Sequence, residues 1–234
     1  MWRLSLTLLC LGLLPACDQP AEDDYFPLNQ GLRWEYQVAI EHPQRLVTKT
    51  LIIEVTGKTV LKEQQVSIRS TSDGTDYYLT QQTEGIYRVA KRTLVEAKPQ
   101  SDAIPRMVLP LPIAHAKGKT WSTISQPYLI ERVFEGQDVM TADSLQFPMT
   151  YTVLSLDETV ELPAGQFSHC VLVEGQTDLS LYADARKGNS IVPITTREWY
   201  APGVGLVKLE REEPLDTEVY KGGKIVMELV RFED

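Results

Sequence analysis

The sequence of 234 residues has little cysteine, little histidine and an excess of acidic over basic residues. It contains three cysteines and three histidines, and 32 acidic residues against 23 basic ones give a formal net charge of −9 at pH 7. Three cysteines in a chain of this length exclude a small fold held together by disulfides. The acidic balance argues against a nucleic-acid partner, because such a surface requires clustered lysine and arginine.

Common catalytic motifs are also missing. The sequence has no Gly-x-Ser-x-Gly, no Ser-x-x-Lys, no Gly-rich phosphate loop and no His-Glu-x-x-His, the signatures of hydrolases, nucleotide enzymes and zinc proteases. The acidic clusters lack the spacing of a calcium loop. We therefore expect no enzyme, no catalytic residue, no metal and no cofactor. The alternative is an envelope hydrolase with scattered catalytic residues, which would need a cleft that gathers His115 or His169 with carboxylates.

The longest apolar run is at the N-terminus, where residues 4–14 follow Arg3. About ten apolar residues are too few to span a bilayer, which needs about 20. Residues 1–16 are therefore predicted to be a signal peptide. The sequence Leu14-Pro15-Ala16-Cys17 that ends it resembles the bacterial lipobox, in which Leu14 and Ala16 would guide the lipoprotein signal peptidase.

This resemblance implies that Cys17 receives a diacylglyceryl thioether and becomes the acylated, palmitate-bearing N-terminus of a lipoprotein. Each buried methylene of an acyl chain contributes about 0.8 kcal/mol to membrane binding, so no basic patch is needed. A lipid bilayer is thus the expected partner of Cys17, and the cell envelope, with the periplasm, is the expected location. The alternative is an ordinary secretory signal in which Cys17 is incidental.

Residues 17–24 form an acidic tether, Cys-Asp-Gln-Pro-Ala-Glu-Asp-Asp, that reaches at most about 25 Å at roughly 3.5 Å per extended residue. Asp18 directly after the lipidated cysteine resembles the signal that retains lipoproteins in the inner membrane of enteric-type bacteria. This resemblance favours the periplasmic face of the inner membrane. Of the cysteines, Cys170 alone would stay unmodified in the mature chain, so no internal disulfide can form, and we expect it to be a small buried side chain.

Residues 25–234 are predicted to form an all-β domain. In residues 33–41 the side chains of Trp34, Tyr36, Val38 and Ile40 share one face, the period of two that is typical of a half-buried strand. Other stretches of this kind are residues 45–56, 60–70, 77–82, 86–92, 128–135, 147–156, 167–174, 179–183, 197–200, 206–211, 217–221 and 224–232.

Turn residues separate these stretches and indicate an antiparallel meander. Turns are predicted at Gly57-Lys58, Asp73-Gly74, Glu84-Gly85 and Gly222-Gly223. The only helix candidate is residues 93–104, which Pro99 disfavours. Residues 104–114 are too rich in proline for a central strand and are interpreted as an apolar crossing segment, with a mobile lid as the alternative.

Two parts of the chain begin alike, each with a Pro-Leu step followed by Gly-x-x-Trp, which ends at Trp34 in one and at Trp121 in the other. The pattern is consistent with two similar halves, residues 25–104 and 105–234, that arose by duplication. Chance recurrence of short patterns is an equal alternative.

Three phrases together resemble a broad set of uncharacterised bacterial lipoproteins and secreted proteins. They are residues 25–28 with Gly31 and Trp34, residues 162–167, and residues 199–208. The resemblance implies an open or half-barrel antiparallel sheet, similar to the carriers that move lipoproteins or other lipids across the periplasm. A curved sheet can leave a concave groove for an acyl chain or a peptide.

The sequence therefore predicts a non-enzymatic envelope lipoprotein that binds a hydrophobic ligand or an envelope protein through a curved β-sheet. The groove residues expected are Trp34, Trp121, Trp199 and Tyr200, although large aromatic side chains at strand starts are often simply core. The alternative is an assembly subunit that pairs the edge of a strand with another protein.

Overall fold

A computed structural model describes residues 24–134, 137–141, 145–184 and 188–234. Leu14, Ala16, Cys17 and Asp18 lie outside the described residues. The described chain is all-β, as predicted, and its strands join one antiparallel sheet. Among the described residues, no helix is long and apolar enough to cross a membrane.

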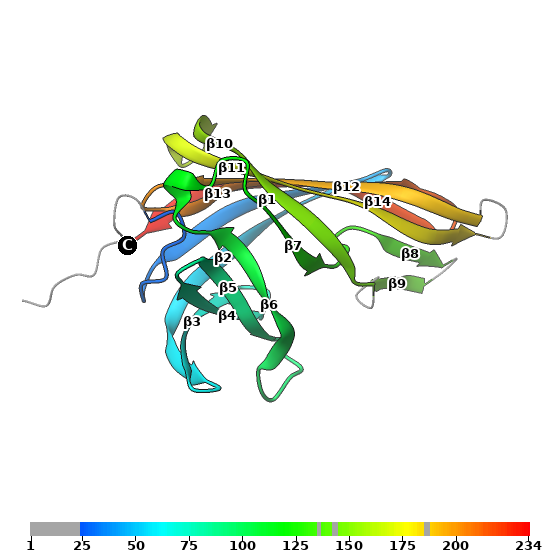
Figure 1. The fold of residues 1–234 in the computed structure, drawn as a ribbon. Coiled ribbons are helices and arrows are strands. Elements are labelled where there is room, and N and C mark those ends of the chain that lie inside the picture. Colours follow the sequence, from blue (N-terminus) through cyan, green and yellow to red (C-terminus); the bar gives the residue numbers. More distant parts are fainter. Residues whose placement is uncertain (1–23, 135–136, 142–144, 185–187) are drawn as a thin grey trace, which may run out of the picture.

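The first half of the chain is a meander that runs from the centre of the sheet to one edge (Figure 1). Its elements are β1 (Arg33–His42), β2 (Arg45–Leu61), β3 (Gln64–Thr71), β4 (Asp76–Gln82), β5 (Gly85–Arg92) and β6 (Gln100–Pro110), followed by the 3₁₀ turn η1 (Ile113–His115).

The second half begins at the opposite edge and returns to the centre. Its strands are β7 (Thr120–Ser125), β8 (Glu131–Phe134), β9 (Gln137–Thr141), β10 (Phe147–Leu162), β11 (Gly165–Asp184), β12 (Gly188–Ala201), β13 (Gly205–Asp216) and β14 (Tyr220–Glu233). The β1–β14 ladder joins the predicted halves into one sheet, and their origin by duplication stays a prediction.

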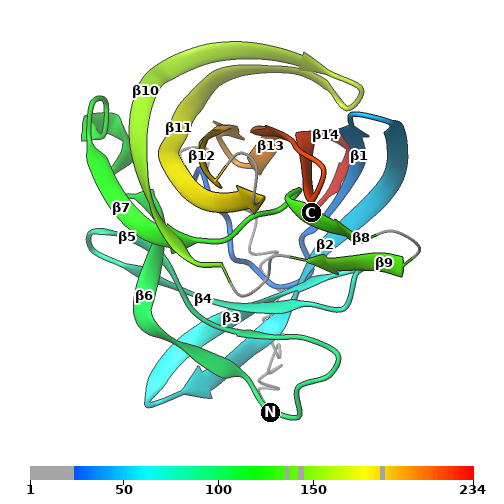
Figure 2. The same cartoon turned by 90° about the vertical axis from the view of Figure 1, so that its right-hand side faces the viewer.

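The sheet curls until its two edges approach each other (Figure 2). The strand order is β6-β5-β4-β3-β2-β1-β14-β13-β12-β11-β10-β7, and the β8–β9 hairpin lies off this path, paired with β14. The predicted curved antiparallel sheet is confirmed, and it is nearly closed as a barrel with one unsealed seam, between β6 and β7.

Side chains bridge this seam in place of a strand ladder. The indole Nε1 of Trp121 in β7 donates to the carbonyl of Met107 in β6, at 3.2 Å. The guanidinium of Arg106 in β6 donates to the carbonyl of Ile124 in β7, at 2.7 Å. The edges are therefore held near each other while most of their backbone groups are unpaired with each other.

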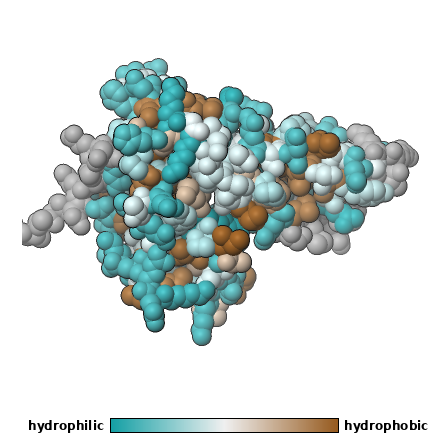
Figure 3. All heavy atoms as spheres, in the orientation of Figure 1, coloured by the Kyte–Doolittle hydropathy of each residue, from teal (hydrophilic) through white to brown (hydrophobic). Residues whose placement is uncertain are grey.

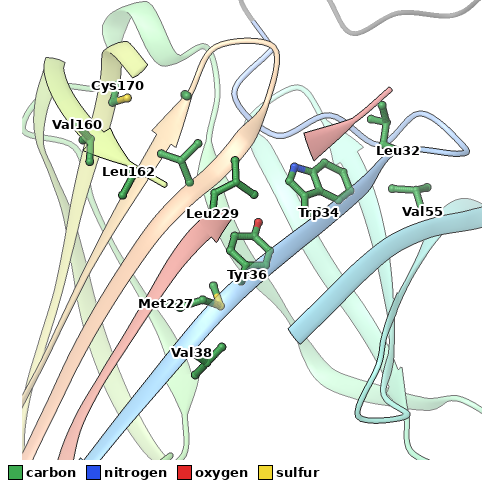
Figure 4. Packing of buried hydrophobic residues seen from close by; sticks show 12 residues of the cluster. Leu32, Trp34, Tyr36, Val38, Val55, Val160, Leu162, Cys170, Met227 and Leu229 are labelled. Atoms are coloured by element: carbon green, nitrogen blue, oxygen red, sulfur yellow. The ribbon is translucent and has the colours of Figure 1, made fainter. Parts of the chain in front are cut away.

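The predicted alternation of β1 positions the core. Trp34, Tyr36 and Val38 are each at most 1% exposed, whereas Ile40 is half-buried near the end of the strand. Figure 4 shows Trp34, Tyr36 and Val38 packed with side chains of β14 and of the curled β10–β11 hairpin. The polar atoms of the aromatic residues are satisfied, because Trp34 Nε1 donates to the Val204 carbonyl at 2.7 Å and the Tyr36 hydroxyl donates to the Leu206 carbonyl at 2.7 Å.

Two predicted glycine turns are wrong, for a reason of packing. Strand β2 continues through Gly57 with a bulge and turns later, at Lys62 and Glu63. Gly222 and Gly223 lie inside β14, where a side chain would overlap the backbone carbonyls of neighbouring strands. These two glycines permit close approach of backbones and do not form a turn.

The helix candidate and the crossing segment were also wrong. The described chain has no helix at residues 93–104, and most of residues 104–114 belong to the edge strand β6. An edge strand tolerates Pro105 and Pro110 because its outer side forms no ladder. The sequence correctly excluded a central strand here. The turns predicted at Asp73-Gly74 and Glu84-Gly85 are confirmed, and the chain also turns at Ala164-Gly165 and at residues 202–205.

Candidate functional site

The predicted groove aromatics are distributed over both faces of the sheet. Trp34 and Tyr200 are buried on the inward face, and Trp121 stacks on Tyr151 at the seam, with ring centroids 5.5 Å apart. Trp199 lies on the outer face, where Lys208 Nζ is 5.3 Å from its ring. Neighbouring residues of a strand point to opposite faces, so the structure does not bring all four to one surface.

The outer surface offers no continuous apolar face in the view of Figure 3, where hydrophobic residues form scattered patches among hydrophilic ones. Leu94, Val95 and Ile104 are the most exposed of the large hydrophobic residues, at 83, 94 and 74%. Scattered exposed apolar side chains are normal for folded proteins. The inward face is more unusual, because it holds charged side chains among the buried apolar ones.

Arg69 is the first of these charged residues. It extends from β3 and is 7% exposed, and its guanidinium carbon lies 4.4 Å from the ring centroid of Phe26 and 4.3 Å from that of Trp34. Its Nε and Nη2 are buried and have no hydrogen-bond partner among the described residues. Burial lowers the pKa of Arg69, and the nearby Tyr36, Tyr200 and Asp24 oppose this shift.

Glu198 and Tyr200 form a hydrogen-bonded pair on β12. The Tyr200 hydroxyl donates to Glu198 Oε2 at 2.5 Å. Burial raises the pKa of Glu198, and the Tyr200 hydroxyl and the charge of Arg211 partly offset this effect. Glu198 is therefore a carboxyl group that the interior favours in its neutral form.

Arg211 and Glu213 form a fully buried ion pair on β13, with a distance of 2.6 Å between Nε and Oε1 and side-chain exposures of 1 and 0%. The carboxylate of Glu213 also accepts hydrogen bonds from the backbone N–H groups of residues 128–130, with distances of 2.9–3.2 Å. Arg211 Nη2 donates to the Gln126 carbonyl at 3.0 Å. This pair fixes residues 126–130, here called the strap, across the inward face.

A fourth charged group lies near the seam. Arg88 binds Asp102 in a bidentate manner, with Nε 2.9 Å from Oδ2 and Nη2 2.8 Å from Oδ1. Arg106 adds a second ion pair to Asp102, at 3.0 Å. Tyr77 lies beneath Arg88, with 5.7 Å from the guanidinium carbon to the ring centroid, and burial raises its pKa to about 12.

The inward face is thus more basic than the chain as a whole. Among the described residues, the charged side chains of these groups are Arg69, Arg88, Arg106 and Arg211, with Asp24, Asp102, Glu198 and Glu213 as the acids near them, so cations and acids are equal in number. The whole chain carries −9. Such an interior attracts an anionic group more than the outer surface does.

Sequence reasoning missed these residues, although a signal was present. On β13 the inward positions are Val207, Leu209, Arg211, Glu213 and Leu215. Charged residues in phase with apolar ones on a strand indicate buried, paired charge. The same signal was weaker for Arg69, because its β3 neighbours on that face include the polar Ser67.

The other predicted candidates lie elsewhere. Cys170 is fully buried, as predicted, and burial raises the pKa of its thiol to about 11. His169 is on the surface, with its Nδ1 2.8 Å from Asp157 Oδ1, and His115 is exposed in η1. In the part of the chain that the structure describes, no group of three or more His, Cys, Asp or Glu side chains is arranged to hold a metal ion.

Comparison with known proteins yields only distant structural likenesses. No protein-family model matches the sequence, and no curated protein gives a significant match. A candidate lipoprotein from Parabacteroides distasonis ATCC 8503 has 15% sequence identity and a TM-score of 0.42, over 92% of this chain and 100% of the other. A candidate exported protein with YmcC-like fold from Bacteroides fragilis NCTC 9343 has 15% identity and a TM-score of 0.38, over 89% and 98%.

Proposed function

We propose that this chain is a lipid-anchored bacterial envelope lipoprotein, without enzymatic activity, that binds a hydrophobic ligand on the inward face of its curved sheet. The observation that carries the ligand-binding part is the composition of that face. It combines apolar side chains with buried aromatic and charged groups, the mixture that binding sites for small amphiphilic molecules use to hold and orient them.

The anchor part of the proposal rests on the lipobox, Leu14-Pro15-Ala16-Cys17. The first described residue of the folded chain, Asp24, is fixed to the body because its carbonyl accepts from the backbone N–H of Gly203, at 2.9 Å. The tether of residues 17–24 would place it at most about 25 Å from Cys17. The domain would therefore work close to its membrane, and Asp18 favours the periplasmic face of the inner membrane.

The test of ligand binding starts from the acylated protein purified from native membranes in a neutral detergent. We expect denaturing extraction followed by mass spectrometry to release a discrete small molecule at close to one equivalent per chain. A lipoprotein of similar size, purified in the same way, is the control for lipids that are merely carried over. An extract no different from that of the control would contradict the ligand-binding proposal.

A second candidate function, binding of an envelope protein partner, is favoured by the seam. Strands β6 and β7 end the sheet without pairing with each other, and an unpaired strand edge can accept an extended segment of another protein. A photo-crosslinking residue at Ile104, which is 74% exposed on β6, would capture such a partner in native membranes. The same residue at Leu46 of β2, 66% exposed, is the control. Equal or absent capture at both positions would contradict this candidate.

A further inference from the structure

The unpaired atoms of Arg69 form one edge of its guanidinium. Nε and Nη2 together make the side-on fork that matches the two oxygens of a carboxylate or phosphate. Arg88 of the same chain shows this use directly, because its Nε and Nη2 bind the two oxygens of Asp102 at 2.9 and 2.8 Å. The corresponding two atoms of Arg69 have no acceptor among the described residues.

The immediate surroundings of Arg69 do not supply an acceptor. Tyr36, Tyr200 and Asp24 are near enough to influence the pKa of Arg69, but the two hydroxyls donate to the Leu206 carbonyl and to Glu198. Asp24 Oδ1 accepts from the backbone N–H of Phe26 at 2.9 Å. Arg69 belongs to no ion pair among the described residues, and its guanidinium carbon lies against the rings of Phe26 and Trp34, while Nε and Nη2 are buried without a hydrogen-bond partner. Buried donors without acceptors cost about 1–3 kcal/mol each, and more when charged, so a structure retains them where something else satisfies them.

Apolar residues adjoin this fork. Phe26 and Tyr200, whose ring centroids are 6.2 Å apart, belong to the buried cluster that also includes Leu79, Ile86 and Val173. A ligand whose charged group reaches Arg69 would therefore extend its remaining atoms among hydrocarbon side chains. The chemistry that suits both parts is an acyl chain with an anionic head.

We infer that Arg69 binds the anionic head group, a carboxylate or a phosphate, of an amphiphilic ligand held on the inward face of the sheet. The inference rests on the proposed function and adds the class of ligand and the residue that recognises it. Phe26 covers one face of the guanidinium and lies in the segment before β1, outside any strand. Of the two rings against the guanidinium, that of Phe26 can move without breaking a strand ladder. We therefore expect the ligand to reach Arg69 from the side that Phe26 covers.

The test measures binding of dodecanoate, dodecyl phosphate and dodecanol to the full acylated protein in phosphatidylcholine nanodiscs, with empty nanodiscs as the partition control. We expect saturable binding of at least one anionic probe and at least tenfold weaker binding of dodecanol. The two anionic probes distinguish a carboxylate head from a phosphate head. Arg69→Met should weaken binding of the anionic probe at least tenfold, and Arg69→Lys, which keeps the charge without the fork, should weaken it by less.

The matched control is Arg197→Met on the outward side of β12, where Arg197 is paired with Glu174. This substitution should leave binding of the anionic probe unchanged. Thermal unfolding of each variant checks the fold, and Arg69→Met is expected to be at least as stable as the wild type because it removes a buried unpaired charge. Equal binding of dodecanoate, dodecyl phosphate and dodecanol, or full anionic binding by Arg69→Met, would overturn the role of Arg69 and leave the proposed function intact. No saturable binding of any of the three would overturn both.

Discussion

Glu198 illustrates how a single buried carboxyl group links stability to pH. Its pKa is raised in the folded protein, mainly by burial, so the folded state retains a proton that the unfolded state has lost. Stability then falls as pH rises from the ordinary carboxyl pKa of about 4.5 through the raised value in the folded state. Below that window both states are protonated and the penalty disappears.

The expected result for Glu198→Gln follows from this loss of stability with rising pH. The variant removes the ionisable group and keeps an acceptor for the Tyr200 hydroxyl, so its thermal midpoint at pH 7 should exceed that of the wild type by roughly 2–4 °C, equivalent to about 1 kcal/mol. The difference should vanish below about pH 4.5. Glu161→Gln, an exposed position on β10, is the control. A gap between wild type and Glu198→Gln that is independent of pH would show that the carboxyl does not titrate as stated.

At the scale of elements, the strap shows how a segment without strand structure is fixed to a sheet. Its backbone N–H groups at residues 128–130 are satisfied by one carboxylate, that of Glu213, and its Gln126 carbonyl by Arg211. The guanidinium carbon of Arg211 also lies 4.0 Å from the ring centroid of Tyr128. Because one buried carboxylate accepts from all three backbone donors, the order of the strap depends on the buried ion pair.

Glu213→Gln should therefore loosen the strap as well as destabilise the protein. Loss of one partner of a buried ion pair costs about 3–5 kcal/mol because it leaves the other charge uncompensated. Hydrogen exchange of the amides at Leu129 and Ile130 should accelerate more than that of the β1 ladder. The neighbouring Glu212→Gln affects an exposed pair with Lys224 and should change stability by less than about 1 kcal/mol. Uniform acceleration across all strands would contradict a local role.

The glycines of β14 lead to a second prediction for an element. A Cβ at Gly222 would overlap the carbonyl of Glu213 on β13, so Gly222→Ala must push two hydrogen-bonded strands apart. We expect a loss of about 3 kcal/mol or more, because overpacking against backbone has no flexible side chain to absorb it. Gly57→Ala is the matched control, since nothing lies within 4 Å of its Cβ position. Denaturant unfolding measures the free energy of unfolding of both variants. Equal values would contradict the close approach of the Glu213 carbonyl to Gly222.

At the scale of the whole molecule, the described start of the chain and its C-terminus lie at one end of the elongated sheet (Figure 1). The seam, by contrast, lies between β6 and β7, the two end strands of the sheet (Figure 2). If Cys17 is acylated as proposed, a tether of at most about 25 Å would restrict how far that end moves from the bilayer. The proposed anchor at Cys17 and the sheet are thus separate parts of the chain, so changing Cys17 should leave the sheet intact.

Cys17→Ser tests this separation. The substitution removes the thiol that is proposed to accept the lipid. We expect the protein to move from the membrane fraction to the soluble fraction with an unchanged circular dichroism spectrum and thermal midpoint. Acyl chains provide about 0.8 kcal/mol per buried methylene, so their loss should release nearly all of the protein. Continued association of the variant with membranes would show that another surface holds it there.

The residues of β1 show why much of this fold could be predicted from sequence. Trp34, Tyr36 and Val38 alternate with polar residues, and a period of two determines both the strand and its buried face without reference to any distant residue. The hairpin turns at Asp73-Gly74 and Ala164-Gly165 are equally local, because Gly74 and Gly165 adopt the positive φ that favours glycine. The all-β class and the antiparallel meander follow from such short-range patterns.

What only the tertiary structure decided involves contacts between residues far apart in the chain. Gly222 and Gly223 look like a turn in sequence, and only the approach of β13 and β1 shows that they serve close packing. Arg69 meets Phe26 and Trp34 because the sheet curls, and Glu213 reaches a strap 83 to 85 residues away. Local propensity determines strands, whereas the curl of the sheet determines which side chains meet inside it, and the latter depends on all the ladders together.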